Sequence, residues 1–263
     1  MYTFTFDRPA TTAEAAKLAA AGAKPLAGGQ TLLASMKLRL ANPENVIDLG
    51  AIKELQGIRR EGGKLVIGAM TRHADVATSA DVRSAIPALA DLAGGIGDRQ
   101  VRNLGTIGGS LANNDPAACY PAAVLGLDAT VVTTHREIAA EDFFTGLFST
   151  ALDEGELITA VKFPQPRKAA YMKFRQPASR FALIGVFVAQ TDAGVRVAVT
   201  GGGSGVVRHQ GLEQALSRSF TPESAASVKI ASDGLSGDLH ATAAYRANLI
   251  SVMAQRAVAK ALG

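Results

Sequence analysis

The first fifty residues alternate between short apolar runs and an amphipathic, alanine-rich stretch. Tyr2–Phe6 (YTFTF) alternates apolar and polar residues with a period of two, which predicts a β-strand. Thr12–Ala21 is rich in alanine and stops at Gly22, so we expect a helix with a glycine at its C-terminal cap. A strand over Lys24–Ala27, a helix over Thr31–Leu40 and a strand over Asn45–Gly50 are predicted next. The opening therefore reads as a small β–α–β unit.

The middle of the chain continues with mixed elements around a long glycine-containing loop. Lys64–Thr71 predicts a strand, and Arg72–Ser79 and Val82–Gly95 predict helices. A glycine loop over Asn103–Asn114 (NLGTIGGSLANN) comes next, and a helix over Tyr120–Leu127 follows it. The remaining expectations are a strand at Asp128–Thr134, a short helix at Glu141–Phe148 and a strand at Gly155–Pro164.

The pattern changes after Pro164–Ala170 (PQPRKAA), where two prolines and basic residues interrupt it and indicate a domain boundary. Three consecutive strands are predicted, at Tyr171–Pro177, Phe181–Thr191 and Gly194–Gly203, and then helices at Pro222–Ser232 and Ala241–Leu262. We expect an α+β protein with an N-terminal domain over residues 1–165, in two lobes of roughly 1–55 and 56–165. Residues 166–263 would form a C-terminal antiparallel sheet backed by helices.

Composition narrows the classes of function. The 263 residues are 48% hydrophobic, enough for a sizeable core, and 27 Lys and Arg stand against 23 Asp and Glu without a long basic run, so nucleic-acid binding is not indicated. No secretion signal or stretch of about 20 apolar residues is visible, which favours a cytoplasmic protein without a transmembrane segment. One cysteine and four dispersed histidines leave no iron–sulfur or zinc ligand set, so we expect no metal site in this chain.

Two loops carry adjacent glycines. Gly28–Gly29 follows the predicted strand Lys24–Ala27, and Gly108–Gly109 lies before the predicted helix Tyr120–Leu127. Backbone N–H groups at a helix start attract anions, and glycine lets a phosphate approach the backbone closely. Two such loops suit the diphosphate of a dinucleotide, although neither matches the Rossmann or Walker pattern. Each pair taken alone favours a tight turn that binds nothing. The cluster Thr200–Gly205 (TGGGSG) is a still weaker phosphate candidate.

The ordered set of motifs is more specific than either loop. PLAGGQTLLASMKLRL, GDRQVRNLGTIGGSLANNDPAA and YMKFRQPASRFALIGV follow one another in the chain. In this order they resemble the FAD-binding (medium) subunit of the molybdenum hydroxylases, the family of xanthine dehydrogenase and carbon monoxide dehydrogenase. The resemblance spans essentially the whole chain. It implies a two-lobed FAD-binding domain of the vanillyl-alcohol oxidase type followed by a C-terminal domain of the carbon monoxide dehydrogenase flavoprotein type.

The resemblance also implies cofactor-binding residues. The first loop would hold the FAD diphosphate through backbone amides, the second loop would do the same from the other side, and Ile96, Ile158 and Lys173 would lie at the flavin. Ile96 and Ile158 are also ordinary core residues by type, and Lys173 an ordinary strand lysine. The implied set is Pro25, Leu26, Ala27, Gly28, Gly29, Gln30, Thr31, Leu32, Ile96, Gly105, Thr106, Ile107, Gly108, Gly109, Ser110, Asn113, Cys119, Ile158 and Lys173.

The implied activity is electron relay, with no catalytic residue in this chain. FAD would be bound non-covalently, because neither glycine loop contains a histidine or cysteine for attachment. The molybdenum cofactor and the iron–sulfur clusters would lie in a large and a small partner subunit, in a dimer of heterotrimers that could associate with the inner face of the membrane through an electron acceptor. A free-standing FAD reductase of the same superfamily is the alternative, and a non-redox nucleotide-binding regulator is a third reading.

Two positions depart from the family pattern. Cys119 occupies a position where many relatives carry an acid that contacts the cofactor, so we expect weaker FAD binding in this chain. Arg180 stands where some relatives carry aspartate. Arg99 and Arg102 precede the second loop, and either surface charge or a supporting role in phosphate binding fits them.

Overall fold

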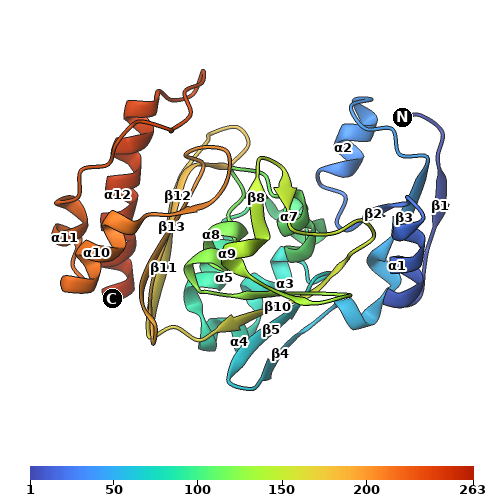
Figure 1. Cartoon of the computed structure of the whole chain (residues 1–263), viewed down its shortest axis with the longest axis horizontal. Coiled ribbons are helices and arrows are strands. Elements are labelled where there is room, and N and C mark those ends of the chain that lie inside the picture. The colour runs from blue at the N-terminus through green and yellow to red at the C-terminus, as the bar shows by residue number, and fades with distance from the viewer.

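The computed structural model describes residues 1–263 and arranges three larger β-sheets in order along the long axis of the molecule, with a two-stranded fourth beside the middle one (Figure 1). The N-terminal lobe is a parallel three-stranded sheet with β3 in the centre. Thr11 caps the first helix by accepting a hydrogen bond from the Glu14 N–H. The elements are β1 (Thr5–Asp7), α1 (Thr12–Ala20), β2 (Lys24–Leu26), α2 (Leu32–Lys37), β3 (Asn45–Asp48) and the 3₁₀ turns η1 (Leu49–Ala51) and η2 (Lys53–Leu55).

The middle lobe is a five-stranded antiparallel sheet in the order β4–β5–β10–β6–β7. Its strands are β4 (Ile58–Glu61), β5 (Lys64–Gly68), β6 (Thr130–Thr133), β7 (Glu137–Ala139) and β10 (Ile158–Pro164), and β8 (Phe144–Gly146) pairs with β9 (Ser149–Thr150) beside it. Its helices are α3 (His73–Thr78), α4 (Ala80–Ala85), α5 (Pro87–Gly94), α6 (Arg99–Leu104), α7 (Ile107–Asn113), α8 (Tyr120–Gly126) and α9 (Ala140–Phe143).

Three expectations for the middle lobe were wrong. The helix predicted over Val82–Gly95 is two helices, because Pro87 has no N–H to continue α4 and holds Ile86 outside the helical region. The loop predicted over Asn103–Asn114 contains the end of α6 and the whole of α7, and Thr106 caps α7. The helix predicted over Glu141–Phe148 ends at Phe143, and the chain continues into the β8–β9 hairpin.

The C-terminal part is a four-stranded antiparallel sheet in the order β11–β12–β13–β14, with helices on one face. The three predicted strands are confirmed, although β14 and α10 were not expected. The elements are β11 (Lys168–Arg175), β12 (Ala182–Thr191), β13 (Gly194–Thr200), β14 (Val207–Arg208), α10 (Gln210–Arg218), α11 (Pro222–Ala226) and α12 (Ala243–Leu262). The prediction of mixed helix and sheet in an α+β chain is therefore confirmed.

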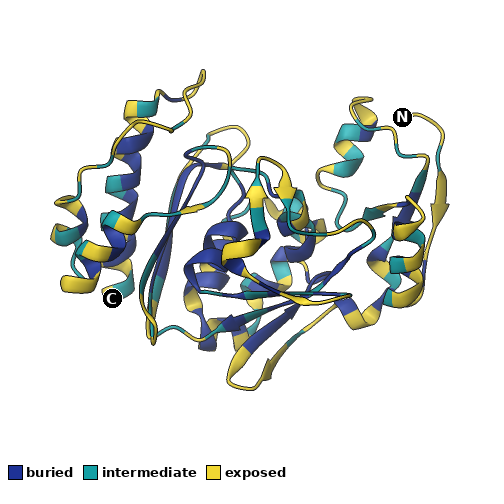
Figure 2. Cartoon of the chain, in the orientation of Figure 1, coloured by how far each residue is buried: buried dark blue, intermediate teal, exposed yellow.

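The C-terminal sheet is covered on both faces. Ile184, Val186 and Val188 of β12 belong to the core formed with α12, whereas Phe187 and Ala189 belong to the core of the middle lobe. Successive side chains of a strand point to opposite faces, so β12 reads as a continuous apolar run. Figure 2 shows the buried residues concentrated in β11–β13, α5 and α8, with exposed residues along β4 and the outer faces of the terminal helices. No helix of the chain has the length and apolar character needed to cross a membrane.

Candidate functional site

The structure brings the two glycine loops into contact. We call residues 27–32 loop A and residues 104–110 loop B. Gly28 lies so close to loop B that a Cβ built on it would be 2.1 Å from the Leu104 carbonyl oxygen and 2.7 Å from Gly105 Cα. A Cβ on Gly109 would lie 3.1 Å from Ala27 Cβ. The loops belong to different lobes, so the absent side chains allow the N-terminal lobe to approach the middle lobe here.

Loop A leaves a run of backbone N–H groups without an acceptor. The N–H groups of Gly28, Gly29, Gln30, Thr31 and Leu32 make no hydrogen bond within the chain, and Thr31 makes no side-chain cap at the start of α2. Gly29 has φ +70°, a left-handed conformation that glycine adopts without strain and that turns consecutive N–H groups toward one side. Gln30 and Thr31 are exposed. Loop A therefore has the free donors that an anionic group such as a diphosphate requires.

Loop B is different, because most of its N–H groups are already paired. The Ile107 N–H donates to the Thr71 carbonyl (3.1 Å), the Gly108 N–H to the Ala69 carbonyl (2.8 Å) and the Gly109 N–H to Thr106 Oγ1 (3.1 Å). The bonds to Thr71 and Ala69 fasten α7 to the segment that follows β5, and the bond to Thr106 caps α7. What loop B presents outward is the half-buried Gly109–Ser110 surface, and Ser110 Oγ has no partner within the chain. Diphosphate binding by the amides of loop B stays a prediction, and its free donors are fewer than the sequence indicated.

A buried histidine supports loop B from behind. The backbone N–H of His73 donates to the Gly105 carbonyl (2.9 Å). The centroid of the His73 ring lies 5.3 Å from that of the Tyr120 ring. Burial, with a smaller contribution from the charge of Arg102, lowers the pKa of His73 to about 4, so its ring is neutral at pH 7. A Cβ on Gly105 would lie 2.6 Å from His73 Nε2. Sequence reasoning missed His73, since nothing in its local sequence indicates that it lies against residues thirty positions away.

Ile96 lies in the turn between α5 and α6, half-buried against the middle-lobe core. Arg102 fixes this turn, because its guanidinium donates to the carbonyl oxygens of Ile96 (2.8 Å) and Gly97 (3.1 Å). Beside the turn is a groove of about 740 Å³ that contains five basic side chains and one acidic side chain. These are Arg83, Arg99, Arg102, Arg175, Lys260 and Asp91. The groove is therefore positively charged, and Arg102 supports the backbone here.

The remaining predicted residues fall on the C-terminal side of loop B. Cys119 precedes α8 and is 5% exposed, and the Lys173 ammonium on β11 donates to its sulfur at 3.3 Å. Lys173 also donates to the Arg180 carbonyl (2.9 Å). Ile158 is the first residue of β10 and is buried in the middle-lobe core. Asn113 ends α7 and is half-buried. Loop B is linked to the Cys119–Lys173 pair through the interior, because the buried rings of His73 and Tyr120 lie between them.

Asn114 has a structural role at the end of α7. It is buried in the left-handed conformation at the end of α7 (φ +41°), and its amide donates to the carbonyls of Gly146 (2.9 Å) and Ser149 (2.7 Å). These bonds hold the β8–β9 hairpin against α7. Asparagine tolerates this backbone conformation, which is why it fits here.

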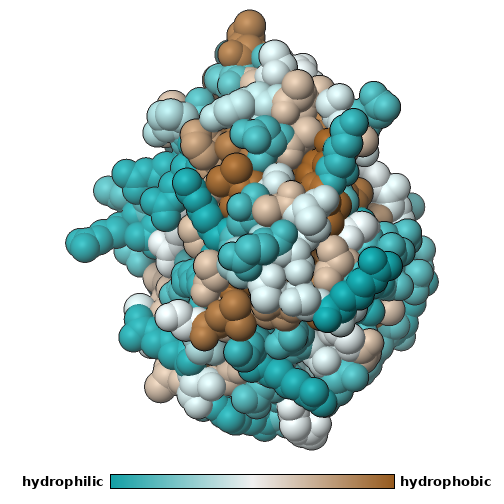
Figure 3. Space-filling model, turned by 90° about the vertical axis from the view of Figure 1, so that its left-hand side faces the viewer, coloured by the Kyte–Doolittle hydropathy of each residue, from teal (hydrophilic) through white to brown (hydrophobic).

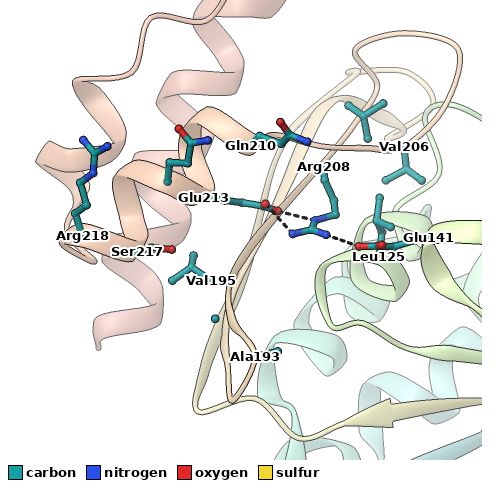
Figure 4. Close-up of a pocket in the computed structure, with 13 residues that line it drawn as sticks. Leu125, Glu141, Ala193, Val195, Val206, Arg208, Gln210, Glu213, Ser217 and Arg218 are labelled. Atoms are coloured by element: carbon teal, nitrogen blue, oxygen red, sulfur yellow. Dashed lines mark hydrogen bonds and ion pairs between the residues drawn. The ribbon is translucent and has the colours of Figure 1, made fainter.

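A second groove, of about 850 Å³, contains none of the predicted cofactor residues. It lies between α8, α9, α10 and the β13–β14 part of the C-terminal sheet, and its Arg208 is bonded to Glu213 and Glu141 (Figure 4). The arginine is therefore already neutralised by carboxylates. The nearby glycine cluster is also structural, since Gly201 (φ +82°) donates its N–H to the Pro116 carbonyl and a Cβ on it would lie 2.5 Å from the Leu183 carbonyl oxygen. No group of three or more His, Cys, Asp or Glu side chains is placed to hold a metal ion.

Comparison with known proteins identifies the family to which this two-lobed fold belongs. Residues 2–166 match the family described as the FAD binding domain in molybdopterin dehydrogenase, so the chain belongs to that family. The chain is a medium, FAD-binding subunit of the molybdenum hydroxylase class of oxidoreductases, which confirms the interpretation from the motifs.

The similarity to individual relatives extends over nearly the whole chain. It is 36% identical to the carbon monoxide dehydrogenase medium chain of Hydrogenophaga pseudoflava, over 97% of this chain and 96% of the relative. It is 35% identical to the 6-hydroxypseudooxynicotine dehydrogenase complex subunit alpha of Paenarthrobacter nicotinovorans, over 91% and 87%. A solved structure of the Hydrogenophaga pseudoflava carbon monoxide dehydrogenase superposes with a TM-score of 0.91 at 34% identity, covering 99% of this chain and 98% of that one.

Proposed function

We propose that this chain binds FAD non-covalently with its diphosphate on loop A and passes electrons from iron–sulfur clusters of a partner subunit to an external acceptor. The observation that carries the proposal is the run of five free N–H groups from Gly28 to Leu32. Gly28 in this run lies so close to the Leu104 backbone that no side chain fits between them. These donors fit a diphosphate, which needs several hydrogen bonds to its negatively charged oxygens. Loop B would contribute the Ser110 hydroxyl and the Gly109 surface rather than a full set of amides.

The other residues would act on the flavin end of the cofactor. When bound, FAD supplies the redox chemistry, and the protein supplies binding, orientation and electrostatics. Lys173 would place a positive charge beside the flavin, where it favours the negative charge gained on reduction. Ile96 would contribute apolar contact from a turn that Arg102 holds rigid. Ile158 would act through the core that supports β10, since its side chain is 6% exposed. Asn113 would shape the end of α7 next to the site.

We place the domain division as predicted, with an FAD-binding domain over residues 1–165 and a C-terminal domain over 166–263. The connection between β10 and β11 consists of residues 165–167, which supports a boundary there. The two domains would nevertheless move little, because Tyr171, Phe187 and Ala198 of the C-terminal sheet belong to the core of the middle lobe. A shared core makes the C-terminal domain a fixed support for Lys173.

The partners would be a small iron–sulfur subunit and a large molybdenum subunit, assembled as a dimer of heterotrimers in the cytoplasm. Exposed apolar side chains are present near loops A and B and in the β8–β9 turn, with Leu104 53%, Leu147 58% and Phe148 57% exposed. Such residues become buried when a partner docks. On the face of the C-terminal helices, hydrophobic groups instead form small patches separated by hydrophilic ones, which is typical of ordinary solvent-exposed surface (Figure 3). We propose carbon monoxide dehydrogenase-like chemistry for the complex, on the similarity to that medium chain.

Co-expression of this chain with candidate small and large subunits tests the proposal. We expect a yellow complex that contains one FAD per copy of this chain, and reduction of that FAD when the molybdenum subunit receives substrate. A chain that binds FAD but is reduced directly by a nicotinamide cofactor without partners would support the free-standing reductase instead. A colourless chain with no affinity for FAD would contradict both.

A further inference from the structure

The groove beside the Ile96 turn concentrates positive charge from four elements of the fold. We call it the basic groove: it has a volume of about 740 Å³, and its basic side chains come from α4, α6, β11 and α12. Five of its fourteen lining residues are basic, and the single acid, Asp91, is paired with Lys260 at 2.6 Å. The excess of four positive charges equals the net charge of the whole chain, +4, so the remaining residues are together neutral.

No carboxylate neutralises the four arginines of the basic groove. Arg83 and Arg102 donate only to backbone carbonyl oxygens. The guanidinium groups of Arg99 and Arg175 make no hydrogen bond and no ion pair within the chain, so all of their N–H groups are available to a ligand. Arg208 in the other groove is different, because two glutamates already hold it. The basic groove is therefore the one of the two that attracts anions.

The lining of the basic groove indicates what kind of molecule it binds. Apart from the charged residues it consists of small or polar ones, without an aromatic or large aliphatic side chain, so a nucleotide base would find no surface on which to stack. Four of the five basic side chains are exposed, and an exposed side chain that keeps its water binds a single anionic group weakly. Several carboxylates on one extended chain can engage these side chains together, and each guanidinium can hold a carboxylate through two parallel hydrogen bonds.

We propose that the basic groove is a docking site for an acidic segment of a partner protein. Charge complementarity carries the proposal, because a groove lined by one sign of charge attracts the opposite sign and speeds the encounter. The segment would lie across both domains, since Arg175 extends from β11 to the end of α5, where a Cβ on Gly95 would be 3.8 Å from its guanidinium. The proposal does not depend on FAD, although a partner docked beside the Ile96 turn would lie next to the flavin of the proposed function.

Fluorescence anisotropy of a labelled polyglutamate peptide, titrated with the full chain, tests the proposal with and without FAD. We expect binding at about 20 mM salt that weakens strongly at about 200 mM, because the contacts join exposed charges. The double variant Arg99→Gln, Arg175→Gln should bind the peptide roughly fivefold more weakly or worse, since two unpaired donors are lost. Lys17→Gln, Lys229→Gln is the matched control: it removes two exposed positive charges outside the groove and should bind within about twofold of wild type.

Tripolyphosphate and FAD separate this site from two others. Tripolyphosphate should bind wild-type protein more weakly than the peptide does, and FAD should bind the Arg99→Gln, Arg175→Gln protein as it binds wild type. The proposal is overturned if the peptide does not bind at low salt, or if the lysine control loses as much affinity, which would mean attraction by overall charge. It is also overturned if tripolyphosphate binds as tightly as the peptide, which would define a small-anion site, or if the arginine variant loses FAD, which would assign these arginines to the cofactor.

Discussion

Replacement of Gly28 by alanine should separate loop A from loop B and weaken FAD binding strongly. The added Cβ would lie 2.1 Å from the Leu104 carbonyl oxygen, whereas ordinary contacts begin at 3.4 Å, so the backbones must move apart by about 1.3 Å, the difference of the two. The atoms that the new Cβ would meet are backbone atoms of Leu104 and Gly105, so no flexible side chain can move aside to relieve the clash. Overpacking of this kind costs about 1–3 kcal/mol of folding stability, so the chain should remain folded.

The effect on the cofactor follows from the donors that loop A provides. A hydrogen bond to a charged oxygen contributes about 1.5–3 kcal/mol, so loss of a single one lowers affinity by roughly one to two orders of magnitude. Fluorescence titration of the flavin-free protein with FAD measures the change, and urea unfolding measures stability separately.

Two matched alanine variants calibrate the result. A Cβ on Gly109 would be 3.0 Å from Thr106 Oγ1, a tight contact that a small shift relieves, whereas a Cβ on Gly205 would have its nearest neighbour at 4.0 Å. We expect the loss of FAD affinity to decrease in the order Gly28→Ala, Gly109→Ala, Gly205→Ala, with the last equal to wild type. The reasoning is refuted if Gly28→Ala binds FAD normally, or if Gly205→Ala loses as much affinity.

Three further outcomes are expected. Acid denaturation of the yellow protein should release all of its flavin and leave a colourless precipitate, since the attachment is non-covalent; a coloured precipitate would contradict this. Cys119→Asp should tighten FAD binding about tenfold in a titration, because a carboxylate forms stronger charge-assisted bonds than a thiol, while Cys119→Ala should change it little; an aspartate variant that binds no better would make this a packing position. Burial favours a higher pKa for Glu156, but hydrogen bonds from Arg136, the Asp153 N–H and Thr133 outweigh it and lower the pKa to about 2. The contribution of ionised Glu156 to stability is therefore complete above pH 4.5 and is lost as the pH falls toward 2. In urea unfolding, the stability advantage of wild type over Glu156→Gln should shrink across that pH range. A difference that stays constant with pH would count against the assignment.

Local periodicity and turn residues were sufficient for most of the elements. The alanine-rich helix α1, the apolar strand β12 and the long helix α12 each have a pattern that extends over several turns or residue pairs, so neighbouring residues alone determine the element. The break between α4 and α5 has a local cause too, since Pro87 lacks the N–H that a continuous helix needs. The order of the glycine and strand motifs was likewise enough to indicate the family, because it is a property of the chain itself.

The tertiary structure decided which glycine loop has free donors. Both loops have adjacent glycines beside a helix start, and their sequences give the same expectation. Loop B differs because Ala69 and Thr71, almost forty residues earlier, supply carbonyl groups to its amides, whereas no segment does so for loop A. Likewise, Cys119 and Lys173 are 54 positions apart and meet only because β11 passes beside the start of α8. Hydrogen bonds between distant segments depend on how the sheets pack together, and no local pattern encodes that packing.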